Sequence, residues 1–403
     1  MLASPPQPLR LRDGSAAAAA WNLSPGVLHL NHGSFGAVPR VTLDYQAELK
    51  NAMESDPVAW FVELPERIKQ QRELLATTFG SPIEATSLIP NASAGATIIY
   101  NSIPVQHGLE IVVTNHGYGA VTMGAERLVR RWGGKVVTAD IPLAANADEA
   151  LAAIEAVLSE RTRLIVVDQV TSSTARLLPV QQIVELARAK EILTLIDGAH
   201  VFGLYQNVFD DFAPDFWIGN LHKFACGPRG AALLVAQSEL NQEIYPLIDS
   251  WGYPSSYPER FDIQGTLDQT SYLAAHRSWE FVANQWGWDK SISYMTELAE
   301  YGQDVISQAF ADHTGQDHTA TVGMPANALK LIKLPEGLIR NHAEADAVRD
   351  RFVREGAAEA AFTEFGGKGY LRISAHVYNT HSEYEEFAER FVPQIVSWAR
   401  ELN

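Results

Sequence analysis

An aspartate and a lysine, each at the end of an apolar run, are the residues whose chemistry is easiest to interpret. Asp197 closes the run 194–197, and Lys223 follows the run 216–218 further along the chain. A lysine amine can form a Schiff base with the aldehyde of pyridoxal 5′-phosphate, and a carboxylate can keep the pyridine nitrogen of that cofactor protonated. The ring then takes up the charge that develops on a substrate carbon. The pair predicts a pyridoxal-phosphate enzyme in which Lys223 and Asp197 bind the cofactor and act in catalysis.

The residues beside this pair agree with that chemistry. His200 follows Asp197 and faces the same side if a turn begins at Gly198, so it could hydrogen-bond the phenolate oxygen of the cofactor. Gly219 and the run Gly-Pro-Arg-Gly at 227–230 allow tight turns on both sides of the lysine, which would hold its amine in place. Helix capping by Asp197 and ordinary burial of His200 are the simpler interpretations.

A run of small residues could bind the cofactor phosphate. Ala92, Ser93 and Ala94 stand where a helix is expected to begin, so their backbone N–H groups and the Ser93 hydroxyl would point at an anion. Asparagine and serine also cap many helices that bind no ligand. The run has neither Walker nor dinucleotide-binding spacing.

Two aromatic rings follow the predicted strand 110–114. His116 or Tyr118 could lie flat on the pyridine ring, and their spacing does not decide which of the two stacks. Either ring could also act in catalysis, because inversion of a substrate carbon needs a second acid on the opposite face.

An arginine stands in the middle of the apolar strand predicted at 369–374. Arg372 at this position must be paired with an anion. The α-carboxylate of an amino-acid substrate is the functional partner we expect, and an internal aspartate or glutamate is the alternative.

Short β-branched runs alternate with helical stretches between residues 87 and 236, which indicates a mostly parallel sheet with helices on both faces. In such a sheet ligands bind beyond the carboxyl ends of the strands, where Asp168, Asp197 and Lys223 fall. The predicted strands are 110–114, 135–138, 164–168, 192–196, 216–218 and 231–236, and the predicted helices are 120–131, 147–159 and 180–190.

After Asp268 the helical periods become longer. We expect helices at 272–283, 291–311 and 382–402, strands at 328–334 and 369–374, and two helices near the N-terminus at 40–54 and 65–79. The predicted organisation is an N-terminal arm at 1–29, a large cofactor-binding domain at 30–268 and a smaller α+β domain at 269–403.

The bulk composition narrows the possible partners. The chain has 403 residues, with 31 basic and 48 acidic side chains and a net charge of −17, which argues against nucleic acid or an anionic membrane as a partner. No apolar run approaches the ~20 residues of a membrane span. The one cysteine, Cys226, suits a reducing compartment, so we expect a cytoplasmic protein. No H-E-x-x-H run or cysteine pair indicates a metal site.

Taken in order, these motifs resemble the class V aminotransferase family of fold-type I pyridoxal-phosphate enzymes, especially its isopenicillin N epimerase-like branch. The resemblance implies the fold-type I transferase fold, and it places Asn31, Gly33 and Ser34 near the substrate. It begins at the run Leu-Asn-His-Gly-Ser-Phe-Gly, and the matching segments are 30–36, 91–95, 116–120, 168–172, 197–200, 219–223 and 372–380.

The same resemblance implies further cofactor contacts. Asn220 and His222 would help to hold the phosphate, and Gly265 and Thr266 would reach the same phosphate from a second subunit. The protein would then be a homodimer with active sites at the subunit interface. In the segment 168–172, the residues expected at the cofactor are Asp168 and Thr171.

Relatives that are cysteine desulfurases carry a nucleophilic cysteine in a loop before the arginine that matches Arg372. The corresponding segment here, 355–359, has no cysteine. We therefore do not expect chemistry that forms a persulfide.

Several reactions would begin alike, because in each the amine of Lys223 removes the α-proton of an amino-acid substrate. Epimerisation requires a second acid, Tyr118 or His116, and is the predicted activity. Elimination of sulfur from Cβ by a C–S lyase and transamination by an aminotransferase are the alternatives. A regulatory protein that binds pyridoxal phosphate without catalysis is an alternative of another class, and the presence of Lys223, Asp197 and Arg372 argues against it.

Overall fold

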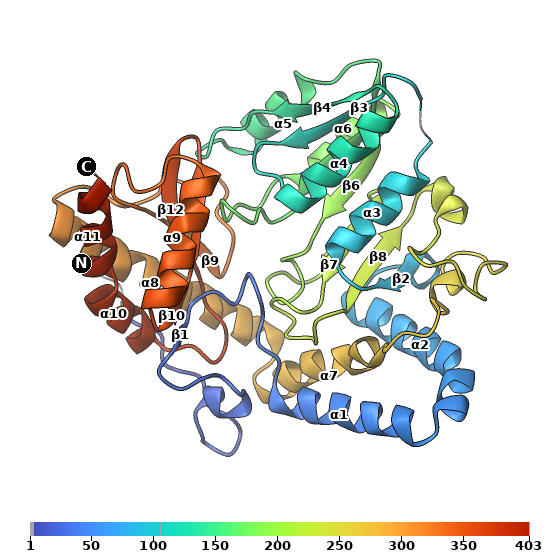
Figure 1. Ribbon diagram of the computed structural model, residues 1–403, viewed down its shortest axis with the longest axis horizontal. Coiled ribbons are helices and arrows are strands. Elements are labelled where there is room, and N and C mark those ends of the chain that lie inside the picture. The colour runs from blue at the N-terminus through green and yellow to red at the C-terminus, as the bar shows by residue number, and fades with distance from the viewer. Residues whose placement is uncertain (1–3, 105, 403) are drawn as a thin grey trace. The chain divides into compact units, whose positions relative to one another are not determined.

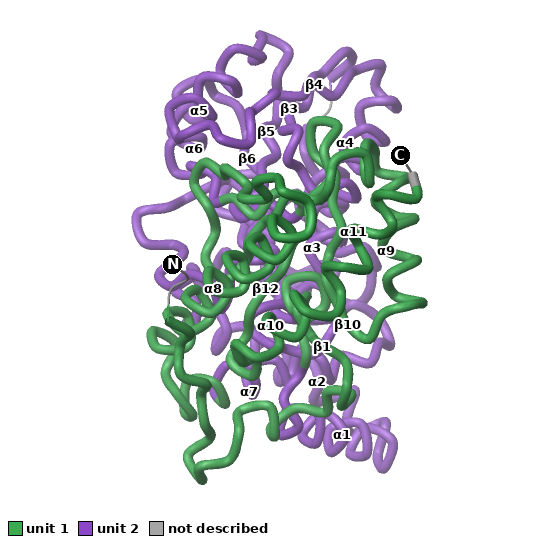
Figure 2. The backbone as a smooth tube through the Cα atoms, turned by 90° about the vertical axis from the view of Figure 1, so that its left-hand side faces the viewer, with its two compact units in different colours: residues 1–37, 173–176, 281–403 green, residues 38–172, 177–280 purple. Residues whose placement is uncertain are grey.

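The computed structural model describes residues 4–104 and 106–402 (Figure 1). The chain divides into two compact units (Figure 2). Unit 1 comprises Met1–Ala37, Ser173–Arg176 and Phe281–Asn403, and unit 2 comprises Val38–Ser172 and Leu177–Glu280. The domain boundaries expected from the sequence, 1–29, 30–268 and 269–403, stay a prediction about independently folding domains.

Unit 2 is built on a seven-stranded sheet in the order β2-β8-β7-β6-β5-β3-β4. Four neighbouring pairs are parallel, and the two pairs that involve β8 are antiparallel. The expected mostly parallel sheet is therefore confirmed. The strands are β2 (Thr86–Ile89), β3 (Glu110–Thr114), β4 (Lys135–Ala139), β5 (Thr162–Asp168), β6 (Leu193–Asp197), β7 (Phe216–Asn220) and β8 (Ala232–Ala236).

One face of this sheet packs against α3 (Ala92–Ser102) and α4 (Gly119–Arg131), which lie side by side (Figure 1). Alternate strand residues form the core on that face, among them Val166, Leu195 and Ile218. Because side chains alternate along a strand, the next residues on the same face are Asp168 on β5, Asp197 on β6 and Asn220 on β7. The apolar pattern of three strands thus fixes the face on which three polar side chains emerge.

The other helices of unit 2 begin and end close to the predicted positions. Two predicted bounds were wrong. One helix begins at Pro57 instead of 65, because the Asp56 side chain caps it by accepting a hydrogen bond from the Ala59 N–H. Another ends at Glu155 instead of 159, where the Ser159 hydroxyl donates to Glu110. These helices are α1 (Arg40–Ser55), α2 (Pro57–Phe79), α5 (Ala147–Glu155), α6 (Val180–Ala189) and the first part of α7 (Thr270–Gln285), with short 3₁₀ turns η2 (Ile83–Ala85), η3 (Glu239–Glu243) and η4 (Glu259–Phe261).

Unit 1 contains a three-stranded antiparallel sheet in the order β11-β12-β9 and a parallel pair, β1 with β10. Four helices accompany them. The elements are η1 (Ala17–Ala20), β1 (Leu28–His29), α8 (Trp288–Thr314), β9 (Leu329–Lys333), α9 (His342–Glu355), β10 (Ala358–Glu359), β11 (Ala361–Phe365), β12 (Lys368–Ser374), α10 (His381–Arg390) and α11 (Val392–Leu402). This combination of helices and antiparallel strands agrees with the α+β architecture expected for this part of the chain.

The single closing helix predicted at 382–402 was wrong, because two helices, α10 and α11, occupy this segment. Pro393 lies in the first turn of α11, where its missing backbone N–H cannot continue the hydrogen bonds of α10. Among the described residues, no helix has the length and apolar character needed to cross a bilayer. The expected cytoplasmic location stays a prediction.

Candidate active site around Lys223

Lys223 lies in a tight turn directly after β7. The backbone N–H of Gly227 donates to the Leu221 carbonyl at 2.7 Å, and that of Cys226 donates to the Lys223 carbonyl at 2.9 Å. The lysine is only 9% exposed, and its Nζ lies 3.0 Å from Nε2 of His200. A buried amine held against an imidazole is a poised nucleophile and base, unlike a lysine that simply extends into water.

Two buried carboxyl groups lie side by side at the ends of β5 and β6. Asp168 and Asp197 are register partners in the sheet, and each is 3% exposed. Asp168 accepts a hydrogen bond from the Tyr118 N–H at 3.2 Å, and Asp197 accepts one from the Ala199 N–H at 2.9 Å. Sequence spacing placed both aspartates at strand ends, and the sheet register brings them together.

Burial raises the pKa of both carboxyl groups. For Asp168 the neighbouring charge of Asp197 raises the pKa further, to well above its ordinary value. For Asp197 the positive charge of Lys223 opposes the effect of burial. A nearby positive charge would stabilise the ionised form of such buried carboxyls. The protonated pyridine nitrogen of the cofactor carries such a charge.

The opposite end of this region has the features of an anion site. The Ala92 N–H donates to Oδ1 of Asn220 at 2.9 Å, which ties the start of α3 to the end of β7. Asn91 caps the helix by accepting from the Ala94 N–H. Nδ1 of His222 is buried and has no hydrogen-bond partner among the described residues. The start of α3 and the unpartnered nitrogen of His222, two residues after Asn220, are the kinds of group that bind a phosphate.

The remaining predicted cofactor residues lie in unit 2 as well. Thr171 is fully buried in the segment after Asp168, and Ser93 is half-buried in the first turn of α3. Gly265 has φ +79°, and Thr266 beside it is exposed. Contact of these last two residues with the phosphate of a second subunit stays a prediction.

His116 and Tyr118 differ in how firmly they are held. His116 is 1% exposed, and its Nε2 lies 2.8 Å from the Ile141 carbonyl, so that nitrogen carries the proton and donates it. Tyr118 is 45% exposed, and the centroid of its ring lies 6.0 Å from Nζ of Lys223. The ring of His116 is thus buried and hydrogen-bonded, whereas the ring of Tyr118 is partly open to solvent. Which ring stacks on the cofactor stays a prediction.

In unit 1, Arg372 gathers the residues expected at the substrate. It is buried in β12, and its Nη2 donates to the Ser34 hydroxyl at 2.6 Å and to Oδ1 of Asn31 at 3.1 Å. The Gly33 N–H donates to the Ser374 hydroxyl at 3.0 Å, which fastens the segment 30–36 to the same strand. These hydrogen bonds tie the guanidinium of Arg372 to the segment 30–36, which the resemblance places near the substrate.

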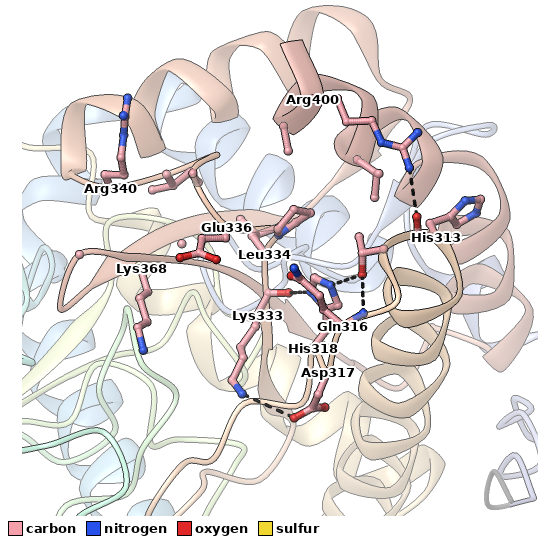
Figure 3. A pocket seen from close by; sticks show the side chains of 18 of the residues that line it. His313, Gln316, Asp317, His318, Lys333, Leu334, Glu336, Arg340, Lys368 and Arg400 are labelled. Carbon is pink, nitrogen blue, oxygen red and sulfur yellow. Dashed lines mark hydrogen bonds and ion pairs between the residues drawn. The ribbon is translucent and has the colours of Figure 1, made fainter. Parts of the chain in front are cut away.

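Unit 1 also contains a pocket of about 900 Å³ (Figure 3). Two of its charged side chains contact other lining residues: Lys333 lies 3.7 Å from Asp317, and Arg400 donates to the His313 carbonyl at 3.1 Å. None of the predicted site residues lines it. We therefore place the chemistry at the strand ends of unit 2 and not in this pocket.

A model of the class-V aminotransferase family matches residues 37–387 of this sequence. The chain belongs to this family. Isopenicillin N epimerase of Streptomyces clavuligerus is 27% identical over 94% of this chain and 98% of its own length. Putative L-cysteine desulfhydrase 1 of Oryza sativa subsp. japonica is 26% identical over 90% of this chain and 82% of its own. A solved C-DES mutant with glycine covalently linked to its PLP cofactor matches with a TM-score of 0.77 at 17% identity, over 94% of this chain and 99% of that one.

Pyridoxal 5′-phosphate is the cofactor of this class-V enzyme, which confirms the prediction from sequence. The chain has groups that would suit the cofactor: a buried amine at Lys223, a buried carboxyl at Asp197 and the unpartnered imidazole nitrogen of His222. Lys223, Asp197 and His222 are the residues that would hold it. Their individual roles remain predictions.

The sequence interpretation missed a contact next to the predicted site, between Gln169 and Trp217. The indole N–H of Trp217 donates to Oε1 of Gln169 at 3.0 Å, and the Trp217 side chain is completely buried. The only signal in the sequence was a tryptophan within the strand that precedes the lysine. That signal does not specify which neighbour the ring meets.

Acid should destabilise the cofactor-free protein through His222. Burial, and then the charges of Lys223 and Arg229, lower the pKa of His222 to about 4, whereas the unfolded imidazole takes up a proton near 6.5. The contribution of His222 is therefore fully present above pH 6.5 and is lost as the pH falls towards 4, by about 2–3 kcal/mol.

Urea unfolding of the cofactor-free protein at about pH 7.5 and about pH 4.5 would measure this effect. His222→Gln lacks the titrating group, so its loss of stability on acidification should be smaller than that of the wild type. The exposed His342, changed to glutamine, controls for the substitution itself. Equal losses in the wild type and His222→Gln would contradict the expectation.

Proposed function

We propose that this class-V enzyme acts at the α-carbon of an amino-acid substrate and that its reaction is epimerisation. The observation that carries the proposal is the buried Lys223 amine, 3.0 Å from His200 at the strand ends where Asp168 and Asp197 also lie. The 27% identity to an isopenicillin N epimerase over almost the whole chain supports the same reaction. When bound, the cofactor supplies a ring that withdraws electrons from the α-carbon.

In this proposal each residue has a distinct task. Lys223 takes the α-proton, and His200 orients the amine towards it. Asp197 keeps the proton on the pyridine nitrogen, because the raised pKa of a buried carboxyl favours pairing with a cation. Arg372 binds the substrate carboxylate, and the hydroxyl of Ser34 holds the guanidinium in its orientation.

Epimerisation also needs a proton donor on the face opposite Lys223. We assign this role to Tyr118 in preference to His116, because the His116 ring is buried and donates to the Ile141 carbonyl. Tyr118 is 45% exposed, so its phenol is accessible to a substrate, whereas the ring of His116 is not. Tyrosine is a residue type used for general acid catalysis.

A C–S lyase is the second candidate, favoured by the 26% identity to a putative cysteine desulfhydrase. Elimination of a thiol from Cβ needs one base, which Lys223 supplies, and no acid on the opposite face. Desulfurase chemistry is not proposed, because the one cysteine of the chain, Cys226, is fully buried. Transamination is the third candidate.

Incubation of the enzyme with L-amino acids and thioether conjugates in deuterated water tests these proposals together. Mass spectrometry would detect deuterium at the α-carbon, chiral chromatography would detect inversion, and assays for pyruvate and thiol would detect elimination. We expect exchange with inversion, and Tyr118→Phe should keep the exchange but lose the inversion. Exchange with release of pyruvate and thiol would identify a lyase. A cofactor-loaded protein that exchanges no substrate would favour the regulatory alternative.

We also propose that the protein is a homodimer, as the family resemblance implies. The segment around Gly265 carries exposed apolar side chains, of which Trp251 is 91% and Ile248 45% exposed. A second copy of the chain would cover such a surface. Light scattering should report twice the mass of one chain, and a monomer at working concentrations would contradict the proposal.

Replacing Arg372 with alanine should raise KM by about 100-fold, because a charge-assisted contact with a carboxylate is worth about 1.5–3 kcal/mol. The KM of Arg372→Lys should lie between those of the wild type and Arg372→Ala, because lysine keeps the charge and loses the planar pair of donors. Lys330→Ala on the neighbouring strand β9 is the matched control, because it removes a buried cation that is paired with Glu300. Steady-state kinetics would measure the effect, and an unchanged KM would mean that the carboxylate binds elsewhere.

A further inference from the structure

The indole of Trp217 lies behind the strand ends that carry the site. Trp217 alternates with Ile218, so it projects from the face of the sheet opposite to Asp197. It is completely buried, and Nε1 donates to Oε1 of Gln169 at 3.0 Å. Gln169 is the residue after Asp168, so this hydrogen bond joins β7 to the end of β5.

Two glycines make room for the indole. A Cβ at Gly198 would lie 2.1 Å from Cζ2 of Trp217, and a Cβ at Gly219 would lie 2.1 Å from Cη2. Only glycine fits at either position without a shift of the ring or the backbone, because van der Waals contact between carbons requires ~3.5–4 Å. Gly198 follows Asp197 directly. The indole therefore packs against the backbone of both strand ends.

Backbone hydrogen bonds complete this assembly. The Gln169 N–H donates to the Asp197 carbonyl at 2.8 Å, and the Gly198 N–H donates to the Ile218 carbonyl at 2.7 Å. The ends of β5, β6 and β7 are thus tied through Gln169 and the indole. Any movement of the ring would move the backbone of Asp197 relative to the strand that leads to Lys223.

We infer that Trp217 is a positioning residue, whose indole sets the spacing between Asp197 and Lys223 at the cofactor. The inference deepens the proposed function and rests on it for the roles of those two residues. Trp217 touches neither cofactor nor substrate in this scheme and acts through Gln169, Gly198 and Gly219. An ordinary core tryptophan would affect stability alone, whereas a positioning residue also changes the properties of the bound cofactor.

Trp217→Phe in the cofactor-loaded protein tests the inference, because phenylalanine keeps an aromatic ring but removes the N–H and part of the volume. Spectrophotometric titration would give the pH midpoint of the lysine-bound cofactor band, and dilution would give the cofactor Kd. We expect a shift of the midpoint by about 0.5–1 pH unit and a Kd weakened about tenfold. kcat should fall about tenfold at unchanged KM, since substrate binding does not involve the indole.

Gln169→Leu is the second variant, because it removes the acceptor of the indole N–H with little change of volume. It should shift the midpoint in the same direction by a smaller amount. The double variant should show little more than Trp217→Phe alone, as expected for residues that act through one contact. Trp60→Phe is the matched control, because Trp60 is 5% exposed in α2 of the same unit and belongs to no part of the site.

Trp217→Phe and Gln169→Leu could both lose thermal stability, as Trp60→Phe does, while the pH midpoint stays at the wild-type value and the cofactor Kd stays within about twofold of the wild type. That result would overturn the inference. If Trp217→Phe does not fold, Gln169→Leu alone decides between these outcomes. The midpoint and the Kd require cofactor binding and no turnover. Both quantities can therefore be measured even in a wild-type protein that exchanges no α-proton. Such a lack of exchange would contradict the proposed function but not this inference.

Discussion

Replacing Lys223 with alanine should lower α-proton exchange by at least ~10⁴-fold and abolish the absorbance band of the lysine-bound cofactor. In the proposed function the Lys223 amine is the base at the α-carbon, and His200, 3.0 Å away, is its hydrogen-bond partner. Borohydride should reduce the bond between the lysine and the cofactor in the wild type, so that the cofactor stays attached permanently. Peptide mapping should then find the attached cofactor at residue 223. Exchange is best measured in deuterated water, where the wild type sets the reference rate.

Two comparisons make this result specific. Lys290→Ala removes an exposed lysine from α8 and should change neither the band nor the exchange. A small primary amine added to Lys223→Ala should restore part of the exchange if the lost group acts as a base. Survival of both the band and the exchange in Lys223→Ala would show that another residue carries the cofactor.

The second large effect is expected from Asp197→Ala, which should lower the exchange rate by ~10³-fold while the cofactor remains bound. The Asp197 carboxyl is buried, and burial raises its pKa, so the group is stabilised as an anion only beside a cation. A protonated pyridine nitrogen is that cation in our assignment. Without the carboxylate the nitrogen loses its proton, and the ring withdraws electrons less strongly.

A cofactor analogue methylated on the pyridine nitrogen separates this explanation from a loss of structure. Its positive charge is permanent, so it should recover a large part of the exchange in Asp197→Ala. Asp215→Asn is the matched control, because Asp215 lies at the opposite end of the same strands and accepts hydrogen bonds from Thr194. A rate within about tenfold of the wild type in Asp197→Ala would contradict the assigned role.

Six of the seven strands of the large sheet were predicted, and most of these six are buried along their length. The strand β2 was missed although all four of its residues are buried, because it is short. The strand Glu110–Thr114 has the predicted bounds, and the helix that begins at Val180 starts where expected. Continuous β-branched runs between amphipathic helices have few other ways to bury their surface. In contrast, α9 was missed, since only Ala345, Val348 and Phe352 are buried among many charged residues. The short strands β10 and β11 were missed for a related reason, because their pairing depends on distant segments.

Only some residues of the predicted site could be found from the pattern of residues along single strands. Asp197 and Lys223 each end an apolar strand, so the alternation of the core residues and the direction of a parallel sheet already bring them to one edge. The difference between His116 and Tyr118 was not accessible in this way. It depends on the Ile141 carbonyl, which binds the ring of His116 and comes from another strand connection.

The sequence by itself determined the fold class and the cofactor, and it predicted which chain positions carry the chemistry, because these depend on residue types and on periodicities along one segment. The tertiary structure alone decided how those positions are held. The pairing of Asp168 with Asp197, the hydrogen bonds around Arg372 and the packing of Trp217 against Gly198 each join segments that are distant in sequence. Such contacts depend on strand register and on the space between side chains, and neither quantity is encoded in the order of residues within a single segment.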